Sequence, residues 1–505
     1  MMCRGELCSP EGMNLLKHGR PNVTPATCHL LNFYDTQADT WVCPYKNNLF
    51  YNIKKLGFQR ELVPFGRGLG DRVPQQSTIY TNIRGDKFMA DFLDKICGCV
   101  WGNGLIFLLL STGIIYTVKL KFIQFRLFPF LIKSAKSGNK NSGLSQFKTV
   151  CMSLGTAMGT GNITGVASAL SIGGAGAVFW MWVSAFFGMA LVYAENSLSV
   201  LYTDSHSKGS VAYMEKGLNS RTLAVIFAVF CILACIGMGG MVQVNTFSES
   251  LTSCTGVNRS ITALAVFLLI FAVIKGGAER IGTVSQVLLP VASLLYICVC
   301  SAVIFRFRHG IPLVFRQIFT QAFGIRQSAG GISGYMVSRA VSAGMKRGIF
   351  SNEAGLGSSP ILHSASESSD SQLQGMWSMF EVFFDTVICC TLTAVTILCS
   401  APDLSVSTAF SSVLGNLSPF FLTAEIMIFS FCTVIGWYYC GHTAFSFISG
   451  NDSHKITALA FSFAVSLGAV FTVKTVWTLS DIFNGLMAFP NLTALLLLMK
   501  KVKRE

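Results

Sequence analysis

Charged residues are scarce in this sequence. Asp, Glu, Lys and Arg make up 12% of its 505 residues, against about 25% in an ordinary soluble domain. A water-soluble protein of this size needs more charge to cover its surface, so the composition excludes a soluble enzyme. A 51% share of apolar residues excludes a disordered or fibrous chain. The composition indicates a polytopic membrane protein, long enough for about ten spans.

Acidic residues are scarcer than basic ones. Asp and Glu number 24 and Lys and Arg 38, which gives a net charge of +14. The basic residues lie mainly between apolar runs and in residues 1–88, and they form no stripe that alternates with stacking aromatics. We therefore expect no nucleic-acid partner. The bias is typical of cytoplasmic loops that face anionic lipid.

Motifs of enzymes, metal sites and pores are missing. The 17 cysteines form no CxxC pairs with histidine at metal spacing, and many lie inside apolar runs, where cysteine acts as a small hydrophobe. The sequence has no HExxH or GxSxG constellation and no filter repeat. We expect no disulfide framework, no zinc site, no cofactor and no enzymatic activity.

Residues 1–88 lack any apolar run near 18 residues and any signal-peptide core. They carry 11 basic and 7 acidic residues, a net +4. The chain changes character from about Trp101, after a short amphipathic start at Met89. One hypothesis is that Met89 is the initiator, that residues 1–88 are an upstream extension, and that 89–505 is the transmembrane domain. A genuine soluble tail is the alternative.

About eleven transmembrane helices are predicted, because a helix needs about 20 apolar residues to cross a bilayer. The predicted fold class is an all-α polytopic membrane protein. The predicted spans are 102–118, 149–171, 176–201, 222–250, 259–274, 281–305, 329–350, 373–400, 418–448, 455–473 and 480–499.

The loop charges predict the orientation. The loop after the first span has no acid and seven basic residues: Lys119, Lys121, Arg126, Lys133, Lys136, Lys140 and Lys148. That loop should be cytoplasmic, which places the mature N-terminus outside and, after eleven spans, the basic C-terminus inside the plasma (inner) membrane. One loop disagrees, since this count places four arginines outside: Arg306, Arg308, Arg316 and Arg326.

The aromatic and basic segment 122–133 has two interpretations. It is either an interfacial helix on the inner leaflet or a simple extension of the first span.

The second span is rich in glycine and small polar residues. They are Gly155, Thr156, Gly159, Thr160, Gly161, Asn162, Thr164 and Gly165. Glycine lets a helix unwind, and unwound backbone in a membrane is tolerated where it lines a cavity or meets a ligand. Its half-helix ends suit a substrate carboxylate and a sodium ion. Close helix packing is the alternative, but the cluster Thr160-Gly161-Asn162 favours a binding site.

A second glycine-rich stretch, 347–367, places Asn352 and Glu353 beside Gly355 and Gly357. It predicts either a discontinuous element near the transport pathway or a structured loop with ordinary helix capping by Ser351 or Asn352. The residues alone do not separate the two.

Two further spans carry polar side chains at hydrocarbon depth. Gln243 and Asn245 must each meet a partner helix or a ligand, and Gln243 could accept from a substrate ammonium. Ser430 and Thr433 lie three apart, hence on one helical face, where two hydroxyls can complete a sodium shell or bond back to their own helix. Trp437 could wall a pocket or anchor near an interface.

Intramembrane acids are functional candidates. Those within or near spans are Glu195, Glu249, Glu381, Asp385 and Glu425. Asp385 is the most deeply placed. It could couple to cation or proton movement, although pairing with another helix is the favoured interpretation.

Together these stretches resemble the alanine or glycine:cation symporter family, also called sodium:alanine symporters. The resemblance covers about residues 90–505 and rests on GTGNITGVASALSIGGAGAVFWMW (159–182), RGIFSNEAGLGSSPILHSA (347–365), MVQVN, IGW, FIQFRLF and FDTVICCTLTA (384–394). Residues 1–88 lie outside it.

The resemblance implies sodium-driven uptake of a small neutral amino acid by alternating access. It implies a leucine-transporter-type inverted repeat, with one peripheral helix before five plus five spans. The implied substrate residues are Thr160, Gly161, Asn162, Gln243 and Trp437, and the implied sodium residues are Gly159, Ser430 and Thr433. Its partners would be the amino acid, sodium and the lipid bilayer. A proton-coupled carrier, with Asp385 titrating, is an alternative, and a channel is another.

The sequence departs from the family pattern at two places. Gly239-Gly240 stands where the family often has Gly-Asn, and Tyr438 follows Trp437 where it usually has Ser. An aromatic near the pocket could reshape it, so the choice between alanine, glycine and serine stays open.

Overall fold

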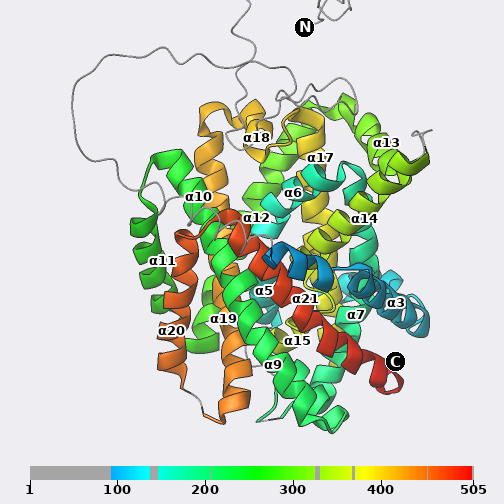
Figure 1. Cartoon of the computed structure of the whole chain (residues 1–505), viewed down its shortest axis with the longest axis vertical. Helices are drawn as coiled ribbons and strands as arrows, with labels where there is room; N and C mark the ends of the chain where they lie inside the picture. The colour runs from blue at the N-terminus through cyan, green and yellow to red at the C-terminus, as the bar shows by residue number, and fades with distance from the viewer. Residues whose placement is uncertain are drawn as a thin grey trace, which may run out of the picture. The chain divides into compact units, whose positions relative to one another are not determined.

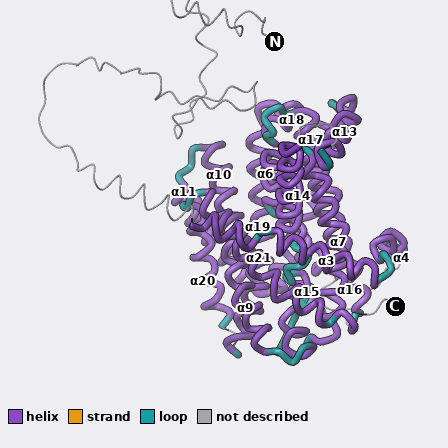
Figure 2. The backbone as a smooth tube through the Cα atoms, turned by 45° about the vertical axis from the view of Figure 1, so that its right-hand side comes forward, coloured by secondary structure: helices purple, strands orange, loops and turns teal. Residues whose placement is uncertain are grey.

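The computed structural model describes residues 92–136, 146–204, 206–324, 330–366, 370–451 and 453–502. The predicted boundary at Met89 lies outside the described residues. Within them every regular element is a helix, and Figure 2 shows no strand there. This confirms the all-α prediction for the described part of the chain.

Each predicted span coincides with one helix or with consecutive helical pieces. They are α3 (Asn103–Lys119), α5 (Gln146–Ala157) with α6 (Thr164–Gly173), α7 (Gly176–Tyr202), α9 (Arg221–Ile236) with α10 (Gln243–Thr255), α11 (Arg259–Ile274), α12 (Gly277–Arg306), α14 (Gly330–Asn352), α16 (Ser371–Val382) with α17 (Thr391–Ser400), α19 (Ser418–Ser449), α20 (His454–Ser466) and α21 (Val473–Leu497). The largest boundary differences are seven residues, at the end of α20, predicted at 473, and at the start of α21, predicted at 480.

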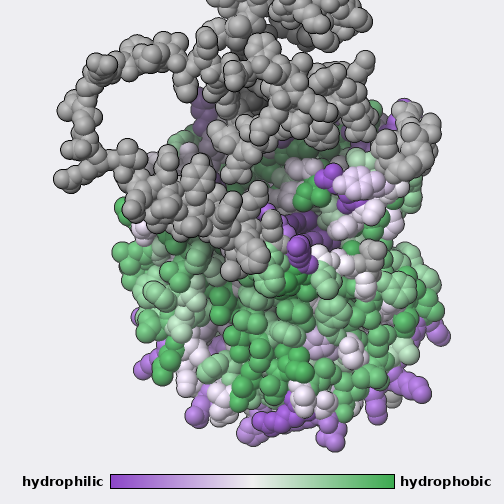
Figure 3. Space-filling model, viewed as in Figure 1, coloured by the Kyte–Doolittle hydropathy of each residue, from purple (hydrophilic) through white to green (hydrophobic). Residues whose placement is uncertain are grey.

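Six of the described helical stretches are long and apolar enough to cross a membrane, and four more apolar helices are shorter. The count of eleven spans therefore stays a prediction. Figure 3 shows a broad hydrophobic surface over the helices, with hydrophilic side chains concentrated at the lower end. That distribution suits a bilayer around the helices and water at their ends.

Two helices are interrupted. The first break, residues 158–163, separates α5 from α6 and contains a short 3₁₀ turn, η5 (Thr160–Asn162). The second break, residues 353–358, separates α14 from the short buried helix α15 (Ser359–His363). Two other helices are continuous but contain π-helical turns, η7 (Gly237–Val242) before α10 and η9 (Phe383–Cys390) between α16 and α17.

The helices form one bundle in which two sets of contacts are extensive (Figure 1). In the first, α7 lies between α14 and α16. In the second, α19 packs on α9 and α10, and α11 packs on α20. Glycine permits the closest contact: a Cβ on Gly344 of α14 would lie 2.3 Å from the carbonyl oxygen of Ala177 on α7. Small residues spaced in this way let two membrane helices approach closely.

Segment 122–133 is not an extension of the first span. Helix α3 ends at Lys119, Lys121 and Phe122 adopt positive φ angles of 51° and 55°, and a separate helix, α4 (Leu127–Lys136), follows. The extension interpretation is therefore wrong, because two left-handed residues redirect the chain. The loop with the four arginines also contains a helix, α13 (Ile311–Ala322), which packs on α7 and α14.

Candidate functional site

The first break brings α10 and α19 into contact with Gly159. A Cβ on Gly159 would lie 2.7 Å from both Gln243 Oε1 and Thr433 Oγ1. Only glycine fits between these side chains without moving them. Three of the predicted substrate and sodium residues therefore meet at the first break: Gly159, Gln243 and Thr433.

Thr160 and Gln243 bond directly to one another. The backbone N–H of Thr160 donates to Gln243 Oε1 at 2.9 Å, and Gln243 Nε2 donates to the carbonyl of Met238 at 3.3 Å. The Thr160 hydroxyl is buried and has no hydrogen-bond partner among the described residues. The amide oxygen of Gln243 thus accepts from a backbone N–H in the unwound segment. A carboxylate oxygen could accept from the same N–H equally well.

Asn162 joins three helical elements. Its Nδ2 donates to the Asp385 backbone carbonyl at 3.1 Å and to Asp385 Oδ1 at 2.7 Å. Its Oδ1 accepts from the Ser351 hydroxyl at 3.2 Å, and the same hydroxyl donates to Asp385 Oδ2 at 2.7 Å. All three residues are buried. The first break, the end of α14 and the π-helical turn η9 are therefore held together by one polar cluster.

Asp385 acts in this structure as a helix-pairing group. Besides Asn162 and Ser351, its carboxylate accepts from the Thr386 hydroxyl at 2.8 Å. The described residues provide it with hydrogen-bond donors but no ion-pair partner. These neutral donors are what a buried carboxylate needs when no cation is beside it.

The second break is a discontinuous helix rather than a surface loop, since residues 351–363 are all buried. Glu353 has a φ of +56°, and Gly355 and Gly357 have φ of +84° and +83°. The left-handed region suits glycine but costs a side-chain-bearing residue about 1 kcal/mol or more. Capping is not the role of Ser351, because its hydroxyl bonds Asp385 and Asn162 instead.

Trp437 on α19 is fully buried, and its Nε1–H donates to Glu353 Oε1 at 2.9 Å. It contacts the second break rather than an interface with lipid. Tyr438, which stands beside it, points to α20, where its hydroxyl donates to the His454 carbonyl at 3.2 Å. The expected reshaping of the pocket by this aromatic is therefore not supported by its position.

Thr433 lies at the sodium position predicted between the second and ninth spans. Its hydroxyl donates to the carbonyl of Gly155 in α5 at 3.0 Å. Ser430 is buried on the same helix, and its hydroxyl has no hydrogen-bond partner among the described residues. Neutral hydroxyl and carbonyl oxygens of this kind are ligands that sodium accepts. The contact with the Gly155 carbonyl was not predicted, because backbone oxygens leave no signal in side-chain patterns.

The other candidate polar residues lie in contacts apart from this cluster. Asn245 donates to the carbonyls of Gly468 and Phe471, both at 2.8 Å. Among the acids, Glu195 accepts from Asn491, Glu249 pairs with Arg259, and Glu381 pairs with His363. These contacts assign them to helix packing, as expected for most buried polar groups.

Sequence reasoning missed a charged cluster next to the breaks. Asp481 on α21 is buried and pairs with Lys346 at 2.6 Å and Arg347 at 3.4 Å. The same two helices make a second contact, in which the rings of Phe350 and Trp477 stack with centroids 5.0 Å apart. Phe350 in turn approaches Gly161, where a Cβ would lie 3.3 Å from Phe350 Cδ1. The spacing of residues in the sequence could not predict this contact, since more than a hundred residues separate α21 from α14.

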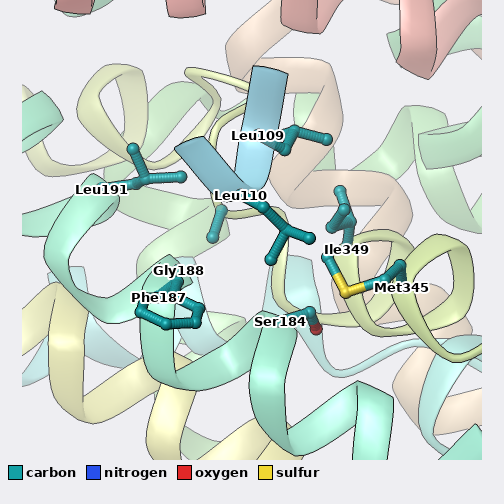
Figure 4. Close-up of a pocket in the computed structure, with 9 residues that line it drawn as sticks. Leu109, Leu110, Ser184, Phe187, Gly188, Leu191, Met345 and Ile349 are labelled. Atoms are coloured by element: carbon teal, nitrogen blue, oxygen red, sulfur yellow. The ribbon is translucent and has the colours of Figure 1, made fainter. Parts of the chain in front are cut away.

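A small recess lies elsewhere, between α3, α7 and α14 (Figure 4). Its lining is apolar apart from Ser184 and contains none of the predicted substrate or sodium residues. The Ser184 hydroxyl is its one polar side chain and bonds the carbonyl of Met181, so the recess lacks the set of polar groups that would orient an amino acid.

A family model described as the sodium:alanine symporter family matches residues 86–505. A sodium/alanine symporter, AgcS, from Methanococcus maripaludis is 37% identical over 431 residues, which cover 80% of this chain and 94% of that protein. A probable sodium/glutamine symporter, GlnT, from Bacillus subtilis is 37% identical over 438 residues, with 82% and 90% covered.

Among solved structures, a Na⁺-coupled sialic acid symporter in a substrate-bound outward-open state aligns with a TM-score of 0.45 and 11% identity. The alignment covers 74% of this chain and 82% of that one.

Proposed function

The chain belongs to the sodium:alanine symporter family, and from this premise we propose that it carries a small neutral amino acid, alanine above all, coupled to sodium. Glycine and serine are the other expected substrates. The observation that carries the proposal is the meeting of the two helix breaks at the buried cluster of Asn162, Ser351 and Asp385.

The first break separates two half-helix ends of opposite polarity. The N-terminal end of α6 and the N–H groups of Thr160 and Gly161 suit a substrate carboxylate. The carboxylate would take the place of Gln243 on the Thr160 N–H, and the released Gln243 Oε1 would accept from the ammonium. The buried Thr160 hydroxyl supplies one further donor.

The carbonyl end of α5 suits the sodium ion. The Gly155 carbonyl and the Thr433 hydroxyl are already 3.0 Å apart. Ser430 lies on α19 with Thr433, and Gly159 lies in the first break, two residues after the end of α5. Sodium bound there would hold the first break in the conformation that the carboxylate recognises. The ion is a transported substrate in this account and no other cofactor is required.

We further propose that the spans number eleven, with spans 2–6 and 7–11 as inverted repeats after a peripheral first helix. Support comes from the packing, since α12 packs on α19 much as α21 packs on α9. The N-terminus of the first span would face outside and the C-terminus the cytoplasm of the plasma (inner) membrane. Labelling of cysteines introduced at Lys121 and Arg308 with a membrane-impermeant reagent tests this, because only Arg308→Cys should react in intact cells.

Proton coupling through Asp385 is the second candidate. The observation in its favour is that Asp385 is buried among the breaks without an ion-pair partner in the described residues. Sodium is preferred because Asp385 is fully supplied with neutral donors, whereas Ser430 is not.

The test is uptake of radiolabelled alanine into proteoliposomes with and without an inward sodium gradient. We expect accumulation only with the gradient. Unchanged uptake when choline replaces sodium would contradict sodium coupling, and loss of uptake on collapsing a proton gradient would favour the proton alternative.

A further inference from the structure

We propose that Glu353 is a positioning residue that fixes the Trp437 indole as a wall of the substrate pocket and thereby limits the size of the amino acid accepted. The inference rests on the proposed function, since it takes Trp437 as a wall of that pocket. It assigns a role to the one carboxylate that the second break itself carries.

The carboxylate of Glu353 is used completely by two neutral donors. Oε1 accepts from the Trp437 indole N–H at 2.9 Å, and Oε2 accepts from the Ser358 hydroxyl at 2.5 Å. Glu353 is 3% exposed and forms no ion pair with any residue of the described chain. Each oxygen of this buried side chain has its own hydrogen-bond partner, so the group that accepts from the indole N–H is itself fixed in place.

A second contact, with Gly239, fixes the base of the Trp437 side chain. A Cβ on Gly239 would lie 2.2 Å from Trp437 Cγ and 2.3 Å from its Cβ. Trp437 therefore packs directly on the backbone of η7, the π-helical turn that leads to Gln243. The tryptophan is fixed between a glycine on one element and a carboxylate on another, with no exposed surface.

The backbone of Glu353 has a strained conformation that its surroundings must hold. Its φ of +56° is a conformation that glutamate rarely adopts, and such strain persists only where the surroundings hold it. The neighbouring positions with positive φ are glycines. A glutamate in the left-handed region, where the other such residues of the break are glycines, is explained if its carboxyl group is needed at the indole.

The hydrogen bond joins two helical elements that pack mainly on different neighbours. Glu353 follows α14, which packs on α7, whereas Trp437 belongs to α19, which packs on α9 and α10. A pocket wall anchored in this way keeps its position only while the second break has the conformation seen here. Alternating access requires the helical groups to move relative to one another, so the wall is released when they do.

The experiment compares alanine and glutamine as substrates of Glu353→Ala, Glu353→Gln, Trp437→Phe and the double variant Glu353→Ala/Trp437→Phe in proteoliposomes. We expect Glu353→Ala to raise the KM for alanine about tenfold, the equivalent of one hydrogen bond to a charged group, and to narrow the discrimination between alanine and glutamine. Glu353→Gln keeps an acceptor for the indole and should stay within about threefold of the unmodified protein.

Non-additivity is the decisive readout. Trp437→Phe removes the N–H from the other side, so the double variant should be no worse than the more severe single variant. Glu425→Gln serves as the control. Glu425 is also a buried glutamate, but it lies on α19 and has no hydrogen bond to Trp437. Thermal unfolding of each purified variant separates loss of selectivity from loss of folding.

The outcomes distinguish the two proposals. If Trp437→Phe leaves alanine KM and selectivity unchanged, Trp437 is not a wall and that part of the proposed function is wrong. If Trp437→Phe changes selectivity but Glu353→Ala does not, the wall stands and the positioning role of Glu353 is overturned. Additive effects of the two substitutions would also overturn it.

Discussion

The two helix breaks solve the same structural problem with different chemistry. In the first, residues 158–163, the chain bends without any positive φ, and the polar groups are neutral hydroxyls and amides. In the second, residues 353–358, three residues have positive φ and a carboxylate lies at the bend. A break without backbone strain can exchange its partners for ligands, whereas a break with three left-handed residues and a buried acidic side chain depends on fixed partners. We therefore assign ligand binding mainly to the first break and positioning to the second.

The largest expected effect is that of Asn162→Ala at the first break. The substitution removes three hydrogen bonds and leaves Asp385 and Ser351 without those partners. A loss of about 3 kcal/mol corresponds to at least a 100-fold loss of uptake, while membrane insertion stays intact. The measurement is initial alanine uptake normalised to the amount of inserted protein.

Asn245→Ala is the matched control for that substitution. Asn245 is also a buried amide, but its two hydrogen bonds go to the carbonyls of Gly468 and Phe471 rather than to either break. We expect it to lower thermal stability and to leave the KM for alanine and the sodium dependence unchanged. Normal uptake by Asn162→Ala would mean that the first break is held by packing alone.

The second effect concerns sodium and separates the breaks directly. Thr433→Val keeps the volume of the side chain and removes the hydroxyl that bonds Gly155. We expect the sodium concentration for half-maximal uptake to rise about tenfold, as for a lost bond to a charged ion. Glu353→Ala at the second break should leave that concentration unchanged. Thr423→Val, a hydroxyl loss on α19 that affects a contact with Ser250, is the control, and an equal shift there would refute the assignment.

The third prediction tests Asp385, which touches both regions through Asn162 and Ser351. Asp385→Asn preserves the shape of the side chain but replaces one acceptor oxygen by an NH₂ group, which faces hydrogen-bond donors instead of accepting from them. We therefore expect uptake to fall about tenfold. If Asp385 only pairs helices, uptake falls by the same factor at every pH from about 5.5 to 8. Disappearance of an existing pH dependence would instead assign proton coupling to Asp385.

The smallest effect is expected from Ser358→Ala in the second break. It removes one of the two donors to Glu353 but leaves the bond to Trp437. We expect a rise of about threefold or less in the KM for alanine. A larger effect than that of Glu353→Ala would show that Ser358, rather than the indole, is the important partner of the carboxylate.

Much of the helical arrangement follows from local sequence. Long apolar runs need backbone hydrogen bonds satisfied within each segment, so the ranges of the helices were predictable. The first break was predictable as well, since glycines and small polar residues cluster at 155–165. The meeting of Gly159, Thr433 and Gln243 confirms that these residues share one region.

Partners across long sequence distances were not predictable. The choice between a loop and a broken helix at 347–367 depended on burial, which only tertiary packing determines. The bond between Glu353 and Trp437 and the cluster of Asp481 with Lys346 and Arg347 each join residues that periodicity cannot relate. The residues left two interpretations of 122–133 open, because neither Lys121 nor Phe122 is of a type that usually adopts the positive φ that redirects the chain.

The central claim is that sodium and the amino acid bind at one break and stabilise each other. The most direct measurement is the alanine dissociation constant of the purified protein at several sodium concentrations, with choline keeping the ionic strength constant. The account predicts that sodium tightens alanine binding, that alanine tightens sodium binding by the same factor, and that Thr433→Val reduces this factor. An alanine affinity that is equal in sodium and in choline would contradict it.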